Sequence, residues 1–160
     1  MGVLHDAVHL EEKAERSYRE AARHVDDPGA RVLFGLLADA EAAHAATLRE
    51  WSGTLDLEGP DLLAAARAWV NKAIEGGSAQ LSSDVRTLGI LRKAMDIERE
   101  TETFYRHHEE RSTDVRVREV LGELAGVEHA HYVLVSSLVE YYNRPNEWVE
   151  SAEFGVRPEY

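Results

Sequence analysis

Two short motifs in this sequence place a carboxylate and an imidazole three residues apart. They are Glu-Ala-Ala-His at 41–44 and Glu-His-Ala-His at 128–131. Residues three apart lie on the same face of a helix, so a Glu and a His at this spacing can reach the same cation. One copy alone would be a weak indication of a metal site, because such pairs are common on helix surfaces. Two copies in one chain are a much stronger indication.

The two motifs belong to an internal repeat with an offset of 87 residues. Glu11 aligns with Glu98, and Tyr18 aligns with Tyr105. Four further identities support the alignment: Glu15 with Glu102, Gly35 with Gly122, Leu37 with Leu124, and Ala38 with Ala125. Each half of the chain therefore carries one Glu, followed 30 residues later by Glu-x-x-His.

Apolar residues at steps of three and four predict the helices that must position these groups. The predicted helices cover residues 3–25, 29–52, 84–111 and 114–143. A tight turn at Asp26-Asp27-Pro28-Gly29 separates the first two helices. No stretch of comparable length alternates apolar and polar residues, so the sequence predicts no sheet.

The lengths of the connections predict the topology. Short turns make two antiparallel hairpins, 3–52 and 84–143, and the connection 53–83 joins them. Because a helix of 24 residues is about 36 Å long, this connection can run the length of a bundle and leave the second and third helices parallel. The sequence thus predicts an all-α four-helix bundle, residues 1–143, with one long crossover.

Two smaller segments complete the predicted organisation. Within the crossover a short extra helix is expected at 61–75, because Asp61 suits an N-cap and Gly76-Gly77 suits a helix end. The tail, 144–160, contains two prolines and little periodicity, so it is expected to be irregular.

The repeated groups should meet in the core of this bundle. In each hairpin the lone Glu and the Glu-x-x-His lie at similar distances from the turn, about 20 Å along the bundle. Four carboxylates cannot pack together in a core without compensation, and two divalent cations would neutralise them. Carboxylates with imidazoles suit iron, manganese or zinc, and iron fits this set best. The predicted ligands of the two metal ions are Glu11, Glu41, His44, Glu98, Glu128 and His131.

The bundle, the crossover and the two Glu…Glu-x-x-His sets resemble the ferritin-like di-iron carboxylate superfamily, and most of all the rubrerythrins. The resemblance covers residues 3–143. It implies that Glu41 and Glu128 are bridging carboxylates and that Glu11 and Glu98 are terminal ones. Glu12 is not an alternative to Glu11, because its partner in the repeat is Arg99, which cannot bind a metal.

The resemblance also implies roles for residues around the metals. Tyr18 and Tyr105 would form hydrogen bonds near the metals or supply electrons, and the alternative is that they are ordinary core tyrosines. Rubrerythrins carry an extra carboxylate one turn after the Glu of the third helix, where this chain has Thr101. Glu102, with Glu15 as a second candidate, is therefore a hypothetical outer carboxylate. The alternative for both is a salt bridge at the edge of the helix face.

Composition excludes several classes of function. The chain has 160 residues and a formal net charge of −12, which disfavours binding to nucleic acid. It contains no cysteine, which excludes disulfides, thiolate metal sites and cysteine nucleophiles. No apolar run is long enough to span a membrane, and the N-terminus lacks the apolar core of a signal peptide. A cytoplasmic location is expected.

The resemblance implies a reaction of two iron ions with H₂O₂ or O₂, as a peroxidase or a ferroxidase. Without a rubredoxin-type centre, electrons would come from another protein or from Fe²⁺ itself. A homo-oligomer is expected, a dimer with hairpins paired within or swapped between chains. The alternatives are iron storage or trafficking, a manganese or zinc protein of the same fold (a manganese catalase among them), a substrate oxygenase, and a metal-free helical adaptor.

Overall fold

The computed structural model describes residues 2–51 and 85–153. This part of the chain consists of four helices and contains no strand. The helices are α1 (Val3–His24), α2 (Pro28–Glu50), α4 (Val85–Arg111) and α5 (Val115–Glu153). Their bounds agree with the sequence prediction within one residue, with two exceptions. Helix α2 ends two residues before the predicted end, and α5 ends beyond its predicted end.

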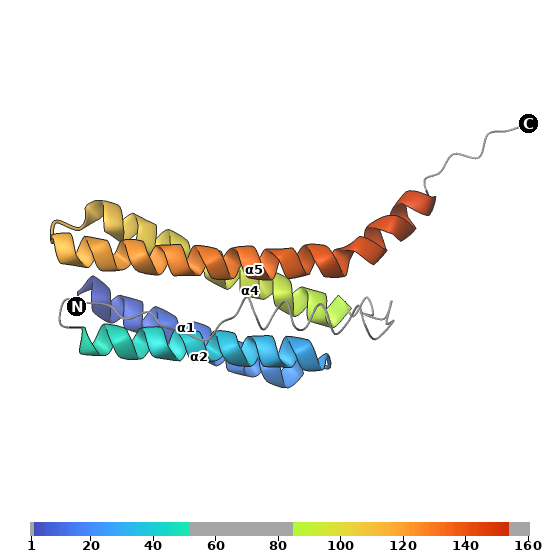
Figure 1. The fold of residues 1–160 in the computed structure, drawn as a ribbon, viewed down its shortest axis with the longest axis horizontal. Helices are drawn as coiled ribbons and strands as arrows, with labels where there is room; N and C mark the ends of the chain where they lie inside the picture. The colour runs from blue at the N-terminus through green and yellow to red at the C-terminus, as the bar shows by residue number, and fades with distance from the viewer. Residues whose placement is uncertain (1, 52–84, 154–160) are drawn as a thin grey trace, which may run out of the picture.

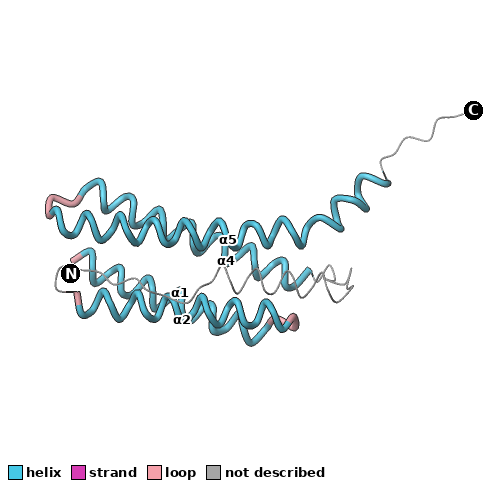
Figure 2. The backbone as a smooth tube through the Cα atoms, in the orientation of Figure 1, coloured by secondary structure: helices cyan, strands magenta, loops and turns pink. Residues whose placement is uncertain are grey.

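The helices form two antiparallel hairpins that lie against each other (Figures 1 and 2). Helix α1 packs along α2, and α4 packs along α5. Helices α2 and α4 run in the same direction, as predicted, so α1 and α4 are antiparallel (Figure 1). The crossover with its predicted helix at 61–75 lies outside the described residues.

The repeat extends to the residues that start the second helix of each hairpin. The Asp27 side chain accepts hydrogen bonds from the backbone N–H groups of Gly29 and Ala30 at 2.7 and 2.9 Å, and Pro28 is the first residue of α2. Asp114, which is 87 residues further on, accepts a bond from the Arg116 N–H at 2.9 Å. Both carboxylates satisfy donors that a helix start leaves without a partner.

The core is divided into two apolar clusters. One contains Phe34, Leu91 and Val135, and the other contains Leu48 and Leu124. Along every helix, residues of one cluster are followed by the polar residues of the repeat and then by residues of the other cluster. The bundle therefore buries a polar layer between two apolar layers.

The prediction for residues 144–153 was wrong, because α5 continues to Glu153 instead of ending at 143. Pro145 lies inside this helix. A proline in a helix removes one backbone hydrogen bond and bends the helix, but it does not always end it. Figure 1 shows the last part of α5 bending away from the bundle. None of the described helices contains an apolar stretch long enough to cross a bilayer.

Candidate metal centre

The polar layer gathers the six predicted ligands into one buried cluster, with one group from α1, one from α4, two from α2 and two from α5. None of the six is more than 6% exposed. The members are Glu11, Glu41, His44, Glu98, Glu128 and His131.

The cluster divides into two groups that could each hold a metal ion, and the two groups share Glu41 and Glu128. Within each group, one ligand atom from every residue lies within 4.8 Å of the others. The first group is completed by Glu11 and His44, on the α1–α2 hairpin. The second group has the same composition but takes its remaining residues from the α4–α5 hairpin, namely Glu98 and His131.

The shared carboxylates direct one oxygen toward each histidine. The Nδ1 atom of His44 lies 3.1 Å from Glu41 Oε2 and 3.5 Å from Glu128 Oε1. The Nδ1 atom of His131 lies 3.4 Å from Glu41 Oε1 and 3.8 Å from Glu128 Oε2. The two imidazole rings are nearly parallel, with centroids 5.9 Å apart. Glu41 and Glu128 thus lie between two equivalent halves.

The buried oxygen and nitrogen atoms of this cluster are suited to binding a cation. Five buried atoms of the cluster have no hydrogen-bond partner among the described residues: Oε2 of Glu11, Oε1 of Glu41, Oε2 of Glu98, Oε1 of Glu128 and Nδ1 of His131. Each carboxylate contributes one such oxygen. A buried polar atom without a partner is costly, so a concentration of such atoms in one place fits the binding of a cation. Carboxylate oxygens and imidazole nitrogens are the donors that iron, manganese and zinc take in proteins.

Without a metal, the carboxylates share protons unequally. Burial is the largest cause that raises the pKa of Glu11 to about 8. Burial, with the negative charge of Glu41, also holds the pKa of Glu128 well above its ordinary value. The pKa of Glu41 is lowered instead, because the neighbouring His131 and His44 outweigh its burial.

The two histidines are held in their charged form. Burial alone would lower the pKa of His44, but contacts with Glu11, Glu128 and Glu41 outweigh burial and raise it to about 12. For His131 the contacts with Glu41 and Glu98 outweigh burial and raise the pKa to about 9. At neutral pH the metal-free cluster therefore keeps protons on both imidazoles, and burial favours the protonated form of Glu11 and Glu128. Divalent cations would take the place of such protons.

Two buried tyrosines form hydrogen bonds with Glu98 and Glu11, each tyrosine with the carboxylate of the opposite hairpin. Tyr18 of α1 donates a hydrogen bond to Oε1 of Glu98 on α4, and Tyr105 of α4 donates one to Oε1 of Glu11 on α1. In both Glu98 and Glu11 the other carboxylate oxygen, Oε2, is the atom without a hydrogen-bond partner. Each tyrosine thus orients its carboxylate and leaves the Oε2 atom of that Glu available to a cation.

Replacing Tyr18 or Tyr105 by Phe is expected to weaken metal binding about tenfold while the fold is retained. Hydrogen bonds to metal-ligating side chains are typically worth about 10–100-fold in metal affinity. Titration of metal-free protein against a competing chelator measures the effect. Tyr132→Phe serves as the matched control, because the Tyr132 hydroxyl accepts a bond from Arg99 away from the cluster. Equal affinities for all three variants would contradict the positioning role.

The outer carboxylates lie outside the cluster. Glu102 contacts Nδ1 of His129 at 3.1 Å, and Glu15 lies 3.4 Å from Arg19. Neither belongs to the two groups described above. These contacts match the alternative reading of both residues, a salt bridge at the edge of the helix face. Thr101 occupies the position at which rubrerythrins carry an extra carboxylate according to the resemblance. It is buried and donates its hydroxyl to the Ile97 carbonyl at 3.0 Å.

Sequence reasoning missed that each tyrosine pairs with the Glu of the other hairpin. The signal was present in the equal spacing of seven residues between Glu11 and Tyr18 and between Glu98 and Tyr105. Helices α1 and α4 are antiparallel, so equal spacings place Tyr105 opposite Glu11 when Tyr18 lies opposite Glu98. Both hydrogen bonds then form together.

Comparison with known proteins gives one result. The sequence model of a family described as Rubrerythrin matches residues 2–139. No curated protein and no solved structure matches the chain. The matched range contains all six residues of the buried cluster and both tyrosines.

Proposed function

Since this chain belongs to the rubrerythrin family, we propose that it binds two iron ions in the buried cluster and reduces hydrogen peroxide with them. The single observation that carries the proposal is that two adjacent ligand groups share Glu41 and Glu128. Shared carboxylates hold two cations side by side, and paired metal sites act together on one substrate.

The proposal gives each residue of the cluster a role. Glu41 and Glu128 would hold both ions, Glu11 and Glu98 would each hold one of them as terminal carboxylates, and each histidine would provide one nitrogen. Iron is chosen over zinc because zinc has no redox chemistry, and the set of oxygen and imidazole ligands suits iron. When bound, two ferrous ions would supply the two electrons that, with two protons, convert one H₂O₂ into two water molecules.

The chain's own contribution is to hold and orient the ligands and to exclude water. All six cluster side chains are buried, so bulk water has little access to the centre. Burial and the nearby carboxylates raise the pKa of Tyr18 and of Tyr105 well above the ordinary value. Both hydroxyls therefore stay protonated and continue to donate to Glu98 and Glu11.

Turnover requires electrons from outside the bundle. The chain has no cysteine, so it cannot carry a thiolate-bound iron centre of its own. An external electron donor is therefore part of the proposal, and so is a homodimer, which the family resemblance favours.

Stopped-flow mixing tests the reaction. Anaerobic protein loaded with two equivalents of Fe²⁺ is mixed with H₂O₂ or with O₂, and the near-ultraviolet absorbance of ferric iron is followed. The proposal predicts that H₂O₂ oxidises the iron at least about tenfold faster than O₂, a difference of about 1.4 kcal/mol in activation free energy. Glu102→Ala, which changes a carboxylate outside the cluster, should keep this preference.

Two outcomes would contradict the proposal. Faster oxidation by O₂ would favour a ferroxidase or an oxidase. Repeated additions of Fe²⁺ and O₂ that load far more than two irons per chain, with a large closed assembly in light scattering, would favour iron storage.

A further inference from the structure

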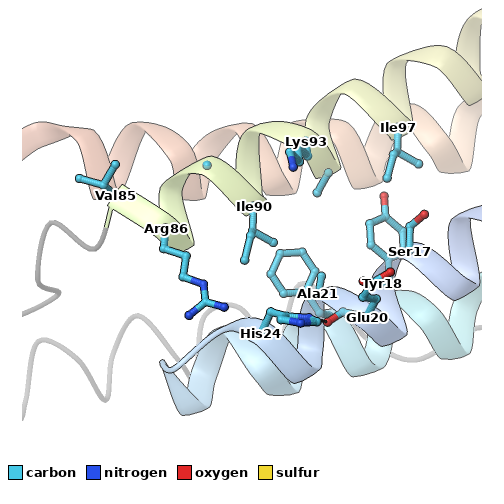
Figure 3. Close-up of a pocket in the computed structure, with 13 residues that line it drawn as sticks. Ser17, Tyr18, Glu20, Ala21, His24, Val85, Arg86, Ile90, Lys93 and Ile97 are labelled. Atoms are coloured by element: carbon cyan, nitrogen blue, oxygen red, sulfur yellow. Dashed lines mark hydrogen bonds between the residues drawn. The ribbon is translucent and has the colours of Figure 1, made fainter.

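A cavity of about 560 Å³ lies between the C-terminal half of α1 and the N-terminal half of α4 (Figure 3). Phe34, Ile90 and Ile97 give it an apolar lining. Tyr18, the donor to Glu98, also lines it. A volume of this size falls within the range of small-molecule sites in proteins.

The internal repeat explains why the cavity exists at this end of the bundle. Ser17 and Ala21 line it, and their partners in the repeat are Phe104 and His108. The rings of Phe104 and His108 lie 4.4 Å apart, and Phe104 packs on the apolar cluster of the other end, as Val3 does. Two small side chains thus line the cavity at positions whose repeat partners at the other end of the bundle carry rings.

Three charged side chains are among the described residues that line the cavity, namely Arg86, Lys93 and Glu20, in a chain of net charge −12. Figure 3 shows Arg86 and Ile90 extending from α4 toward α1. Lys93, also on α4, is exposed and forms no ion pair within the part of the chain that the structure describes. Glu20 is the one carboxylate among the described residues that line the cavity, so the formal charges of these three side chains sum to a positive value. An apolar base with a positive rim complements an amphipathic anion.

We propose that this cavity binds an organic monocarboxylate with an apolar body, of the kind that a medium-chain fatty acid represents. The apolar body lies against Phe34, Ile90 and Ile97, and the carboxylate pairs with the Lys93 ammonium. This site goes beyond the proposed function and requires no metal in the cluster.

Calorimetric titration of the full chain as purified tests the site with three probes of equal length: octanoate, octanol and octylamine. Octanoate is expected to bind at one site per chain. Octanol, which lacks the charge, should bind about tenfold more weakly, because it forms no ion pair with the Lys93 ammonium. Octylamine should bind weakest of the three, because its charge is repelled by Lys93.

Two variants locate the binding. Lys93→Met should weaken octanoate about tenfold and leave octanol unchanged, whereas Lys13→Met, at an exposed lysine outside the cavity, should change neither. Ser17→Phe introduces the side chain that the other end carries and should abolish binding of both probes, while Ser17→Ala should not. Since Lys93 is exposed, its substitution leaves the fold intact even if Ser17→Phe does not fold.

Three outcomes would overturn the proposal. They are no saturable binding of octanoate, equal affinity for octanoate and octylamine, and octanoate binding that Lys93→Met leaves unchanged.

Discussion

Glu41→Ala is expected to remove both metal ions from the chain, whereas Glu98→Ala is expected to remove only one. Glu41 belongs to both ligand groups, and Glu98 belongs only to the group that contains His131. Loss of a metal ligand should weaken binding by more than about 100-fold, the upper end for residues that only support a ligand. Metal per chain, measured after gel filtration of iron-loaded protein, distinguishes the two variants.

The repeat supplies a second pair of variants and a control for this experiment. Glu128→Ala should behave like Glu41→Ala, and Glu11→Ala should behave like Glu98→Ala. Glu102→Ala should retain both ions, because Glu102 lies one position from the buried face of α4 and pairs with His129. Equal losses in Glu41→Ala and Glu98→Ala would contradict the sharing of carboxylates.

The metal-free protein is expected to lose thermal stability as the pH rises from about 5 to above 8. The pKa of Glu11 is raised from its ordinary value of 4.5 to about 8, and the pKa of His131 is raised to about 9. A group with a raised pKa in the folded state contributes stability below its ordinary pKa and loses it as the pH rises through the folded value. Glu128 and His44 are raised as well, so they act in the same direction.

Glu41 does not oppose this trend in the same pH range. Its pKa is lowered, so its contribution is lost only as the pH falls below the ordinary value of 4.5. The midpoint of thermal unfolding of the metal-free protein should therefore fall by on the order of 5 °C between pH 5.5 and pH 8.5.

Metal-loaded protein should show the reverse dependence. Metal ions bind deprotonated carboxylates and neutral imidazoles, so binding releases protons and strengthens as the pH rises. Calorimetric scans of chelator-treated and metal-loaded protein at several pH values measure both trends. A metal-free protein that is more stable at pH 8.5 than at pH 5.5 would contradict the assignment of raised pKa values to the cluster.

The sequence was sufficient to predict the four helices and the residues of the cluster. The reason is that a helix fixes which residues share a face, and the two copies of Glu-x-x-His share one spacing to their lone Glu. The parallel course of α2 and α4 followed from connection lengths alone. The choice of Glu11 over Glu12 followed from the repeat, and Glu12 indeed lies at the surface, where it pairs with Arg49.

Features that depend on contacts between hairpins were not predicted. The pairing of Tyr18 with Glu98 requires the antiparallel register of α1 and α4. Glu102 shares a helix with Glu98, but a rotation of about 100° per residue separates it from Thr101, which lies on the buried face. The cavity was not predicted because it depends on the small side chains of Ser17 and Ala21 at one end of the bundle. The periodicity of apolar residues gives no information on the volume that side chains leave unfilled. The continuation of α5 past Pro145 depends on how a helix accommodates a bend.

The measurement that most directly tests the central claim is the iron content of the full chain by mass spectrometry after anaerobic loading with Fe²⁺ and removal of loosely bound ions. The proposed centre predicts two irons per chain. Two ions of another metal, with iron rejected, would keep the site but contradict the iron chemistry. No tightly bound metal would contradict the site itself.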